Sequence, residues 1–150
     1  MNTKAEIDSV LNRKKLAFAG VSGDPKKFSR VVYKELKDKG YELYPVNPKL
    51  DEVEGDKCYR SVSDLPDDVK WGILMTPKAS TPEVLKEAID KGFESIWIQQ
   101  GAHSPQALEM AENAGIKLVY NKCIMMFASP VKGVHAFHRF LARIFGKVPA

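Results

Sequence analysis

Leu16-Ala17-Phe18-Ala19, followed at once by Gly20-Val21-Ser22-Gly23, has the form of a buried strand that ends in a tight glycine turn. A helical pattern comes next, and a second strand, 42–46, then runs into the turn Asn47-Pro48-Lys49. This order predicts a right-handed βαβ unit, in which both turns end on the same edge of a parallel sheet. Open α/β folds bind nucleotides at that edge, because strand ends and helix N-termini converge there.

The alternation of strand and helix continues through the chain. Short apolar runs typical of covered parallel strands occupy 16–21, 42–46, 71–75, 95–99 and 117–120. Helices are expected over 29–39, from Thr81-Pro82 and from Ser104-Pro105, with Ser29, Thr81 and Ser104 as N-caps. The polar segment 50–69 is expected to hold only a short strand or turn. The pattern predicts a single α/β domain, Rossmann-like and doubly wound, with a mainly parallel sheet of about five strands.

The ends of the chain differ from this domain, which we place at residues 14–123. Residues 1–13 are polar and are expected to form an N-terminal extension or a short helix. Residues 124–150 are expected to form an amphipathic helix, from about 134 to 145, and a tail. The apolar stripe of that helix, Val134, Phe137, Leu141 and Ile144, is expected to pack on the sheet's edge or on a second copy of the chain.

Composition excludes several classes of protein. The 150 residues are 44% hydrophobic and 28% charged, as in ordinary globular domains. No run of about 18 apolar residues and no secretory signal pattern occurs, so we expect a cytoplasmic protein without membrane contact. The net charge of +4 is too small to indicate a nucleic-acid binder. Cys58 and Cys123 lack the spacing of a zinc site or a disulfide framework.

The first turn departs from the dinucleotide fingerprint GxGxxG, because Ser22 and Pro25 stand where its second and third glycines would be. Gly20 and Gly23 still permit close approach of the backbone to a phosphate. Ser22 adds a hydroxyl group. Positive charge at the start of the following helix comes from Lys26 and Arg30.

The second turn lacks the acidic residue with which NAD enzymes hold the ribose hydroxyl groups. It carries Asn47, Pro48 and Lys49 instead, and the lysine can pair with a phosphate as a point charge. A 2′-phosphate, as in NADP, and a 3′-phosphate, as in coenzyme A (CoA), both satisfy that arrangement. The residues of this turn leave the two open.

Two further loops follow the predicted third and fourth strands of the sheet. Thr76 and Pro77 come after the strand at 71–75, and Gln100 and Gly101 come after the strand at 95–99. Helix starts follow both loops, so both can present N–H groups to a ligand at the same edge.

Taken together, these loops give the chain a resemblance to a known family. Gly20-Val21-Ser22, Pro45-Val46-Asn47-Pro48-Lys49 and Trp97-Ile98-Gln99-Gln100-Gly101 are similar to motifs of the CoA-binding domain proteins, as are Ala111-Glu112-Asn113-Ala114-Gly115 and Asn121-Lys122-Cys123. These small Rossmann-like proteins are related to the N-terminal nucleotide domain of the succinyl-CoA synthetase α subunit. The resemblance implies CoA phosphates at Gly20 to Gly23, Lys49 near the adenosine end, and Thr76-Pro77 and Gln100-Gly101 along the groove.

No set of residues has the form of a catalytic centre. The synthetase relatives use a histidine in a second domain that this sequence lacks, and no nucleophile, base and orienting group come together. His135 and His138 are spaced to share a helix face, but no further metal ligand accompanies them. We therefore expect non-catalytic binding of CoA or an acyl-CoA, as a sensor or carrier module. The alternatives are an NADP-dependent oxidoreductase or redox-sensing domain, and a protein-interaction module with a vestigial nucleotide pocket.

Overall fold

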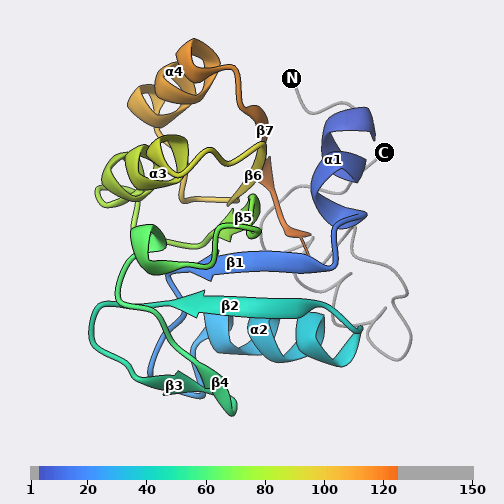
Figure 1. Cartoon of the computed structure of the whole chain (residues 1–150), viewed down its shortest axis with the longest axis vertical. Helices are drawn as coiled ribbons and strands as arrows, with labels where there is room; N and C mark the ends of the chain where they lie inside the picture. The colour runs from blue at the N-terminus through green and yellow to red at the C-terminus, as the bar shows by residue number, and fades with distance from the viewer. Residues whose placement is uncertain (1–3, 125–150) are drawn as a thin grey trace.

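The computed structural model of the chain describes residues 4–124, and these form one parallel sheet covered on both faces. The sheet comprises β1 (Lys15–Ala19), β2 (Glu42–Val46), β5 (Trp71–Leu74), β6 (Ser95–Gln99) and β7 (Lys117–Lys122). Its order is β2-β1-β5-β6-β7, and every neighbouring pair is parallel (Figure 1). From β1 the chain adds β2 on one side of the sheet, and it then adds β5, β6 and β7 in turn on the other side. The order in which strands are added therefore reverses between β1 and β5. The expected Rossmann-like α/β architecture is confirmed.

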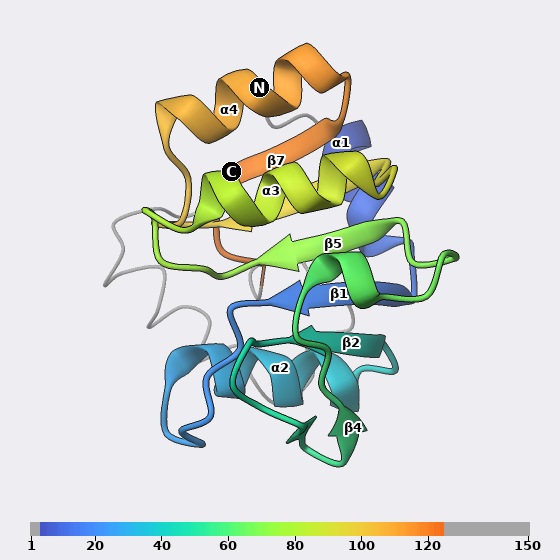
Figure 2. The ribbon, with the colours of Figure 1, turned by 60° about the vertical axis from the view of Figure 1, so that its left-hand side comes forward.

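Helices lie on both faces of this sheet, as a doubly wound fold requires. On one face are α1 (Lys4–Leu11) and α2 (Phe28–Asp38), and on the other are α3 (Thr81–Asp90) and α4 (Pro105–Ala114) (Figures 1 and 2). The α1 helix lies within the segment 1–13 that was expected to be an extension or a short helix. The helix expected over 134–145 lies outside the described residues.

Two hydrophobic cores result from the alternation of side chains along the strands. Leu16 and Phe18 of β1 point to the core beneath α1 and α2, whereas Ala17 and Ala19 point to the core beneath α3 and α4. Trp97 of β6 is fully buried in the first core. Each core removes large apolar side chains from water and so fixes the helices over the sheet.

Two of the three predicted N-caps are wrong, because each helix begins earlier than expected. The turn in which the Lys27 N–H donates to the Asp24 carbonyl lets α2 begin early, with Lys27 at the N-cap and no side-chain cap. Ser29 therefore lies inside the helix. Thr81 is likewise the first helical residue, after an N-cap at Ser80. The third expectation is confirmed, because Ser104 accepts a hydrogen bond from the Ala107 N–H at 3.2 Å.

The segment expected to be a short strand or turn has more structure than its composition suggested. It forms the hairpin β3 (Glu52–Val53) and β4 (Asp56–Lys57), followed by the 3₁₀ turn Val62–Asp64. Between these, Tyr59 pairs with β2, since its N–H donates to the Pro45 carbonyl at 2.8 Å and its carbonyl accepts from the Asn47 N–H at 2.9 Å. This pairing brings residues 60–62 to the carboxyl edge of the sheet.

The glycine turn after β1 passes directly against the end of β5. Gly20 has a φ of +91°, and a Cβ built on it would lie 2.5 Å from the Met75 carbonyl carbon and 2.6 Å from the Thr76 nitrogen. Both obstacles are backbone atoms, so neither can move aside. Only glycine fits here, and the turn and the β5 loop are therefore held in contact.

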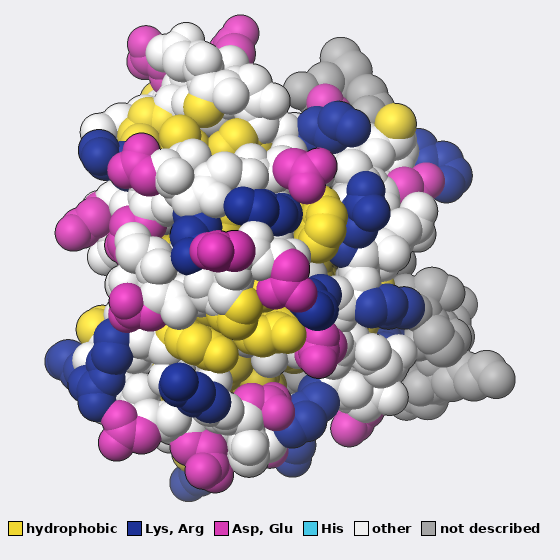
Figure 3. Space-filling view, in the orientation of Figure 1, with side chains coloured by type: hydrophobic (Ala, Val, Ile, Leu, Met, Phe, Trp, Pro, Cys, Tyr) yellow, Lys and Arg dark blue, Asp and Glu magenta, His cyan; other side chains and the backbone are white. Residues whose placement is uncertain are grey.

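Acidic and basic side chains are interspersed over the face of the molecule that Figure 3 displays. Among residues 4–124, no helix has the length and apolar character that crossing a membrane requires.

Candidate functional site

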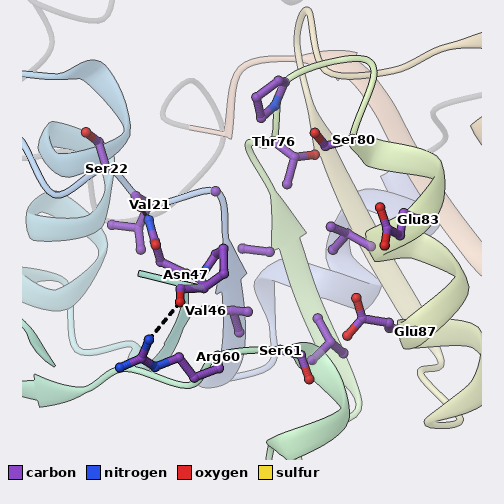
Figure 4. Close-up of a pocket in the computed structure, with 16 residues that line it drawn as sticks. Val21, Ser22, Val46, Asn47, Arg60, Ser61, Thr76, Ser80, Glu83 and Glu87 are labelled. Atoms are coloured by element: carbon purple, nitrogen blue, oxygen red, sulfur yellow. Dashed lines mark hydrogen bonds between the residues drawn. The ribbon is translucent and has the colours of Figure 1, made fainter. Parts of the chain in front are cut away.

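A cavity of about 540 Å³ opens at the carboxyl edge of the sheet, where the strand order reverses. Its walls come from four parts of the chain (Figure 4). These are the glycine loop after β1, the turn after β2 with the adjoining segment 60–62, the loop after β5, and the exposed side of α3. Ligands of open α/β folds bind at such a reversal point.

The glycine loop presents donor groups. Among the described residues, no hydrogen-bond partner takes up the N–H groups of Val21 and Gly23, whereas the Ser22 N–H donates to Ser29 Oγ at 2.9 Å. Ser22 Oγ accepts from the Asp24 N–H at 3.0 Å, which leaves its hydroxyl hydrogen to donate elsewhere. The Gly23 N–H and the Ser22 hydroxyl belong to residues with exposed surface and can donate to an anion at the start of α2, whereas Val21 is 0% exposed and its N–H is buried.

Arg30 supports this loop from behind. Its Nη1 donates to the carbonyl oxygens of Ser22 (3.2 Å) and Gly23 (3.3 Å), and its Nη2 is paired with the Glu54 carboxylate. The residue is 9% exposed and does not line the cavity. Because Arg30 draws both carbonyl groups to one side, it acts in this structure by positioning the loop rather than by offering a free charge to the cavity.

The β3–β4 hairpin is fastened to α2 by a second set of charged contacts. Lys37 Nζ donates to the Glu54 carbonyl at 2.6 Å and lies 3.1 Å from the Asp56 carboxylate, which also accepts from the Tyr33 hydroxyl at 2.5 Å. The hydrogen bond from Arg30 holds the pKa of Glu54 below its ordinary value, and burial together with the Asp56 hydrogen bond raises the pKa of Tyr33. Glycine loop, α2 and hairpin thus form one connected unit.

The turn after β2 is tied to the glycine loop by a side chain. Asn47 Nδ2 donates to the Val21 carbonyl at 2.8 Å, and Asn47 Oδ1 accepts from the Lys49 N–H at 2.8 Å. Pro48 lines the cavity, while Lys49 is exposed just outside it. Arg60, a residue that sequence reasoning missed, lies on this rim with Nη1 donating to the Pro48 carbonyl at 2.8 Å.

The β5 loop contributes an acceptor. Thr76 and Thr81 hydroxyl oxygens are 2.6 Å apart, and Thr81 Oγ1 donates to the Pro77 carbonyl at 3.3 Å. If Thr81 uses its hydrogen on Pro77, Thr76 must donate to Thr81. Thr76, which is 7% exposed and lines the cavity, then offers lone pairs to a ligand.

The wall formed by α3 was not predicted. Ser80, Glu83, Val84 and Glu87 line the cavity along one side of the helix. Their spacing of three and four residues was the available signal, because such residues share one helix face. This face received no assignment from the sequence, because the position of β5 next to β1 is a property of the sheet order, which the sequence alone did not supply.

Of the thirteen residues predicted to bind a ligand, the structure brings seven together around the cavity: Gly20, Val21, Ser22, Asn47, Pro48, Thr76 and Pro77. The other six do not line it: Gly23, Lys26, Arg30, Lys49, Gln100 and Gly101. Gln100 and Gly101 follow β6, one strand farther along the same edge, where the Gln100 N–H donates to the Lys122 carbonyl at 3.1 Å. The ligand contacts of all thirteen residues remain predictions.

Groups suited to metal binding or nucleophilic chemistry are not assembled at the cavity. Residues 4–124 contain no group of three or more His, Cys, Asp or Glu side chains that could hold a metal ion. Cys58 and Cys123 are buried, and burial raises the pKa of the Cys58 thiol. His103 packs on the Tyr120 ring, with 5.7 Å between ring centroids. His135 and His138 lie outside the described residues.

Comparison with known proteins gives a consistent picture. A family model described as "CoA binding domain" matches residues 14–129. The α subunit of an ADP-forming acetate–CoA ligase from Pyrococcus furiosus is 32% identical over 129 residues, or 79% of this chain, which spans only 28% of that subunit. An uncharacterized Bacillus subtilis protein, YneT, is also 32% identical, over 81% of this chain and 91% of its own length.

Solved structures agree with the fold. A hypothetical protein from Pyrococcus horikoshii OT3 superimposes with a TM-score of 0.77 at 39% identity, covering 83% of this chain and 88% of the other.

The contact between Arg30 and Glu54 yields a pH-dependent prediction. Because the folded-state pKa of Glu54 is lowered, its stabilising effect is present above the ordinary glutamate pKa and is lost as the pH falls through the folded-state value. Glu54→Gln should lower the free energy of unfolding at pH 7 by about 1 kcal/mol, a modest figure because the carboxylate is 25% exposed. Urea unfolding at pH 7, 5, 4 and 3 measures the difference from wild type, which should shrink toward pH 3.

Glu52→Gln is the matched control, because Glu52 is an exposed residue of the same hairpin. A Glu54→Gln deficit that stayed constant down to pH 3 would show that the carboxylate charge is not what stabilises the hairpin.

Proposed function

This chain belongs to the CoA-binding domain family, and from that premise we propose that it binds coenzyme A, free or acylated, in the cavity at the carboxyl edge of the sheet. We propose further that it does so without catalysing a reaction of its own. It would serve as a sensor or carrier of the ligand.

The observation that carries the proposal is the arrangement of donors and charges around the cavity. The Ser22 hydroxyl, which lines the cavity, and the Gly23 N–H, on the same loop just outside it, would supply donors for a pyrophosphate at the start of α2. The turn after β2 has Asn47 and no carboxylate to accept from a ribose 2′-hydroxyl. The Asn47 side chain instead donates to the Val21 carbonyl and accepts from the Lys49 N–H. Lys49, exposed and next to Pro48 of the rim, would pair with the 3′-phosphate that distinguishes CoA from NAD.

The extent of the similarity supports a binding module. The chain corresponds to less than a third of the ligase subunit, yet to nearly all of the Bacillus subtilis relative. The part shared with the ligase is therefore found in a protein of similar size, and we propose that binding is the property the two have in common. The ligase reaction belongs to the ligase, of whose subunit this chain spans only 28%.

A thermal-shift panel tests binding. CoA and acetyl-CoA at about one hundred times their dissociation constant should stabilise the protein by about 2.7 kcal/mol, or roughly 5–10 °C in melting temperature. NAD should shift the melting temperature much less, because the glycine loop departs from GxGxxG and the β2 turn lacks an acid. NADP and ATP complete the panel. Stabilisation by NAD equal to or greater than that by CoA would overturn the proposal.

Lys49 should distinguish CoA from dephospho-CoA. Lys49→Glu should weaken CoA binding by about 1.5–3 kcal/mol, the worth of a charge-assisted contact, and should affect dephospho-CoA much less since it lacks the 3′-phosphate. Isothermal titration of both ligands measures the difference. Lys117→Glu is the control, because Lys117 is exposed at the start of β7, the opposite edge of the sheet. Equal weakening of both ligands would give Lys49 another role.

The protein should not turn over CoA substrates. Catalysis needs a positioned acid, base or nucleophile in addition to a binding groove, and none lines the cavity in a nucleophile–base pair. Purified protein incubated with acyl-CoA panels, and with ATP, CoA and carboxylic acids, should release no thiol and form no thioester above background. Turnover that disappears on replacing His103 or Cys123 would contradict this and identify that residue as catalytic.

A further inference from the structure

One wall of the cavity carries negative charge, although the ligand proposed for it is an anion. Glu83 and Glu87, one helical turn apart on α3, both line the cavity; we call this pair the acidic wall (Figure 4). Among the described residues, the Glu83 carboxylate has no ion-pair or hydrogen-bond partner, and Glu87 has only a 3.5 Å contact from Ser63 Oγ. Oxygen lone pairs of both side chains are therefore available to something in the cavity.

Phosphate groups are disfavoured beside this wall, because like charges repel, and the one cationic side chain in the described lining of the cavity, Arg60, is paired with Asp51. The donor groups that suit phosphates lie instead at the glycine loop, across the cavity from α3 (Figure 4). The ligand must therefore be oriented with its phosphates toward Val21 and Ser22 and with an uncharged, hydrogen-donating part toward Glu83 and Glu87.

The surroundings of the acidic wall specify the shape of that part. Apolar side chains also line the cavity, from β2 and its turn, from the segment 60–62 and from α3: Val46, Pro48, Val62 and Val84. A group with apolar faces and a donor on its edge satisfies both the valines and the carboxylates. Adenine has this form, with its 6-amino group as the edge donor.

Connectivity within the ligand favours the same assignment. The adenine base and the 3′-phosphate are attached to one ribose, so a 3′-phosphate near Lys49 places the base on the Pro48 side of the cavity. The pantetheine arm leaves from the pyrophosphate at the other end, and its amide donors lie on a flexible chain without flat apolar faces. Of the donors that CoA has, the 6-amino group best fits the acidic wall.

We propose that the acidic wall reads the 6-amino group of adenine, and that Glu83 and Glu87 thereby determine the base specificity of the site. This inference rests on the proposed function and assigns a part of the ligand to a part of the cavity.

The experiment compares CoA with its hypoxanthine analogue, which has a 6-oxo group in place of the 6-amino group, a proton on N1, and nearly the same shape. Wild-type protein should bind CoA at least about tenfold more tightly, because the 6-oxo group turns a lone pair toward the carboxylates in place of the amino donor, and the N1–H beside it lies on a different line from the 6-amino hydrogens. In Glu83→Gln/Glu87→Gln, the side-chain amide can donate to the 6-oxo group, so the preference should fall at least fivefold. The single variants show which glutamate contributes more.

The ratio of the two affinities separates hydrogen bonding from charge. Removing negative charge from the cavity strengthens both ligands equally and leaves the ratio unchanged, whereas loss of 6-amino recognition changes the ratio. Glu109→Gln, at an exposed position on α4, is the matched control and should preserve the wild-type ratio.

Three results would count against the inference, and they differ in what they imply. A wild-type protein that binds both ligands equally, or a double variant that keeps the wild-type ratio, would overturn base recognition by the acidic wall while CoA binding stands. A wild-type protein that binds neither ligand would overturn the proposed function as well.

Discussion

The contact between Gly20 and the backbone of Met75 and Thr76 is the constraint on which the site depends. A side chain at residue 20 would overlap backbone atoms 2.5–2.6 Å away, so the first loop can reach this position only as glycine. The contact joins the ends of β1 and β5, the two strands between which the sheet order reverses. With that distance set, the remaining walls of the cavity can be placed relative to one another.

Polar side chains then fix the loops that the sheet leaves free. Asn47 links the β2 turn to the glycine loop, and Arg30 links the glycine loop to Glu54 of the hairpin. Arg30 is buried and its Nε has no hydrogen-bond partner among residues 4–124, so its charge is compensated by few groups. Removal of Asn47 would leave the carbonyl of the buried Val21 unsatisfied, and removal of Glu54 would leave the buried Arg30 guanidinium without its ion pair, and each loss costs more than the bond itself contributes.

The sequence was sufficient for the sheet but for only half of the cavity. The strands were recognisable because short, nearly continuous apolar runs such as 95–99 are typical of parallel strands that are covered on both faces. The acids Glu83 and Glu87 could not be assigned from the sequence, since exposed positions of an amphipathic helix look the same whether they face water or a cavity. Arg60 was missed for a different reason: the hydrogen bonds that bring Tyr59 beside β2 are between backbone groups, and the side chains of segment 50–69 give no sign of them. Ser29 shows the reverse error, because a residue of the right type for an N-cap lies inside the helix and holds the glycine loop instead.

The opposite chemical character of the two walls has a consequence for how a ligand enters. N–H donors at the glycine loop attract an anion, while the carboxylates on α3 repel it, so a phosphate-bearing ligand meets a gradient across the cavity rather than a uniform field. Only the orientation with phosphates at the loop satisfies both walls. Such an arrangement would lower the affinity that charge alone would give, but it would suppress reversed binding. If a phosphate-bearing ligand occupies the cavity as we propose, the carboxylates on α3 would contribute to selectivity by disfavouring wrong orientations, as repulsive elements do in specific interfaces generally.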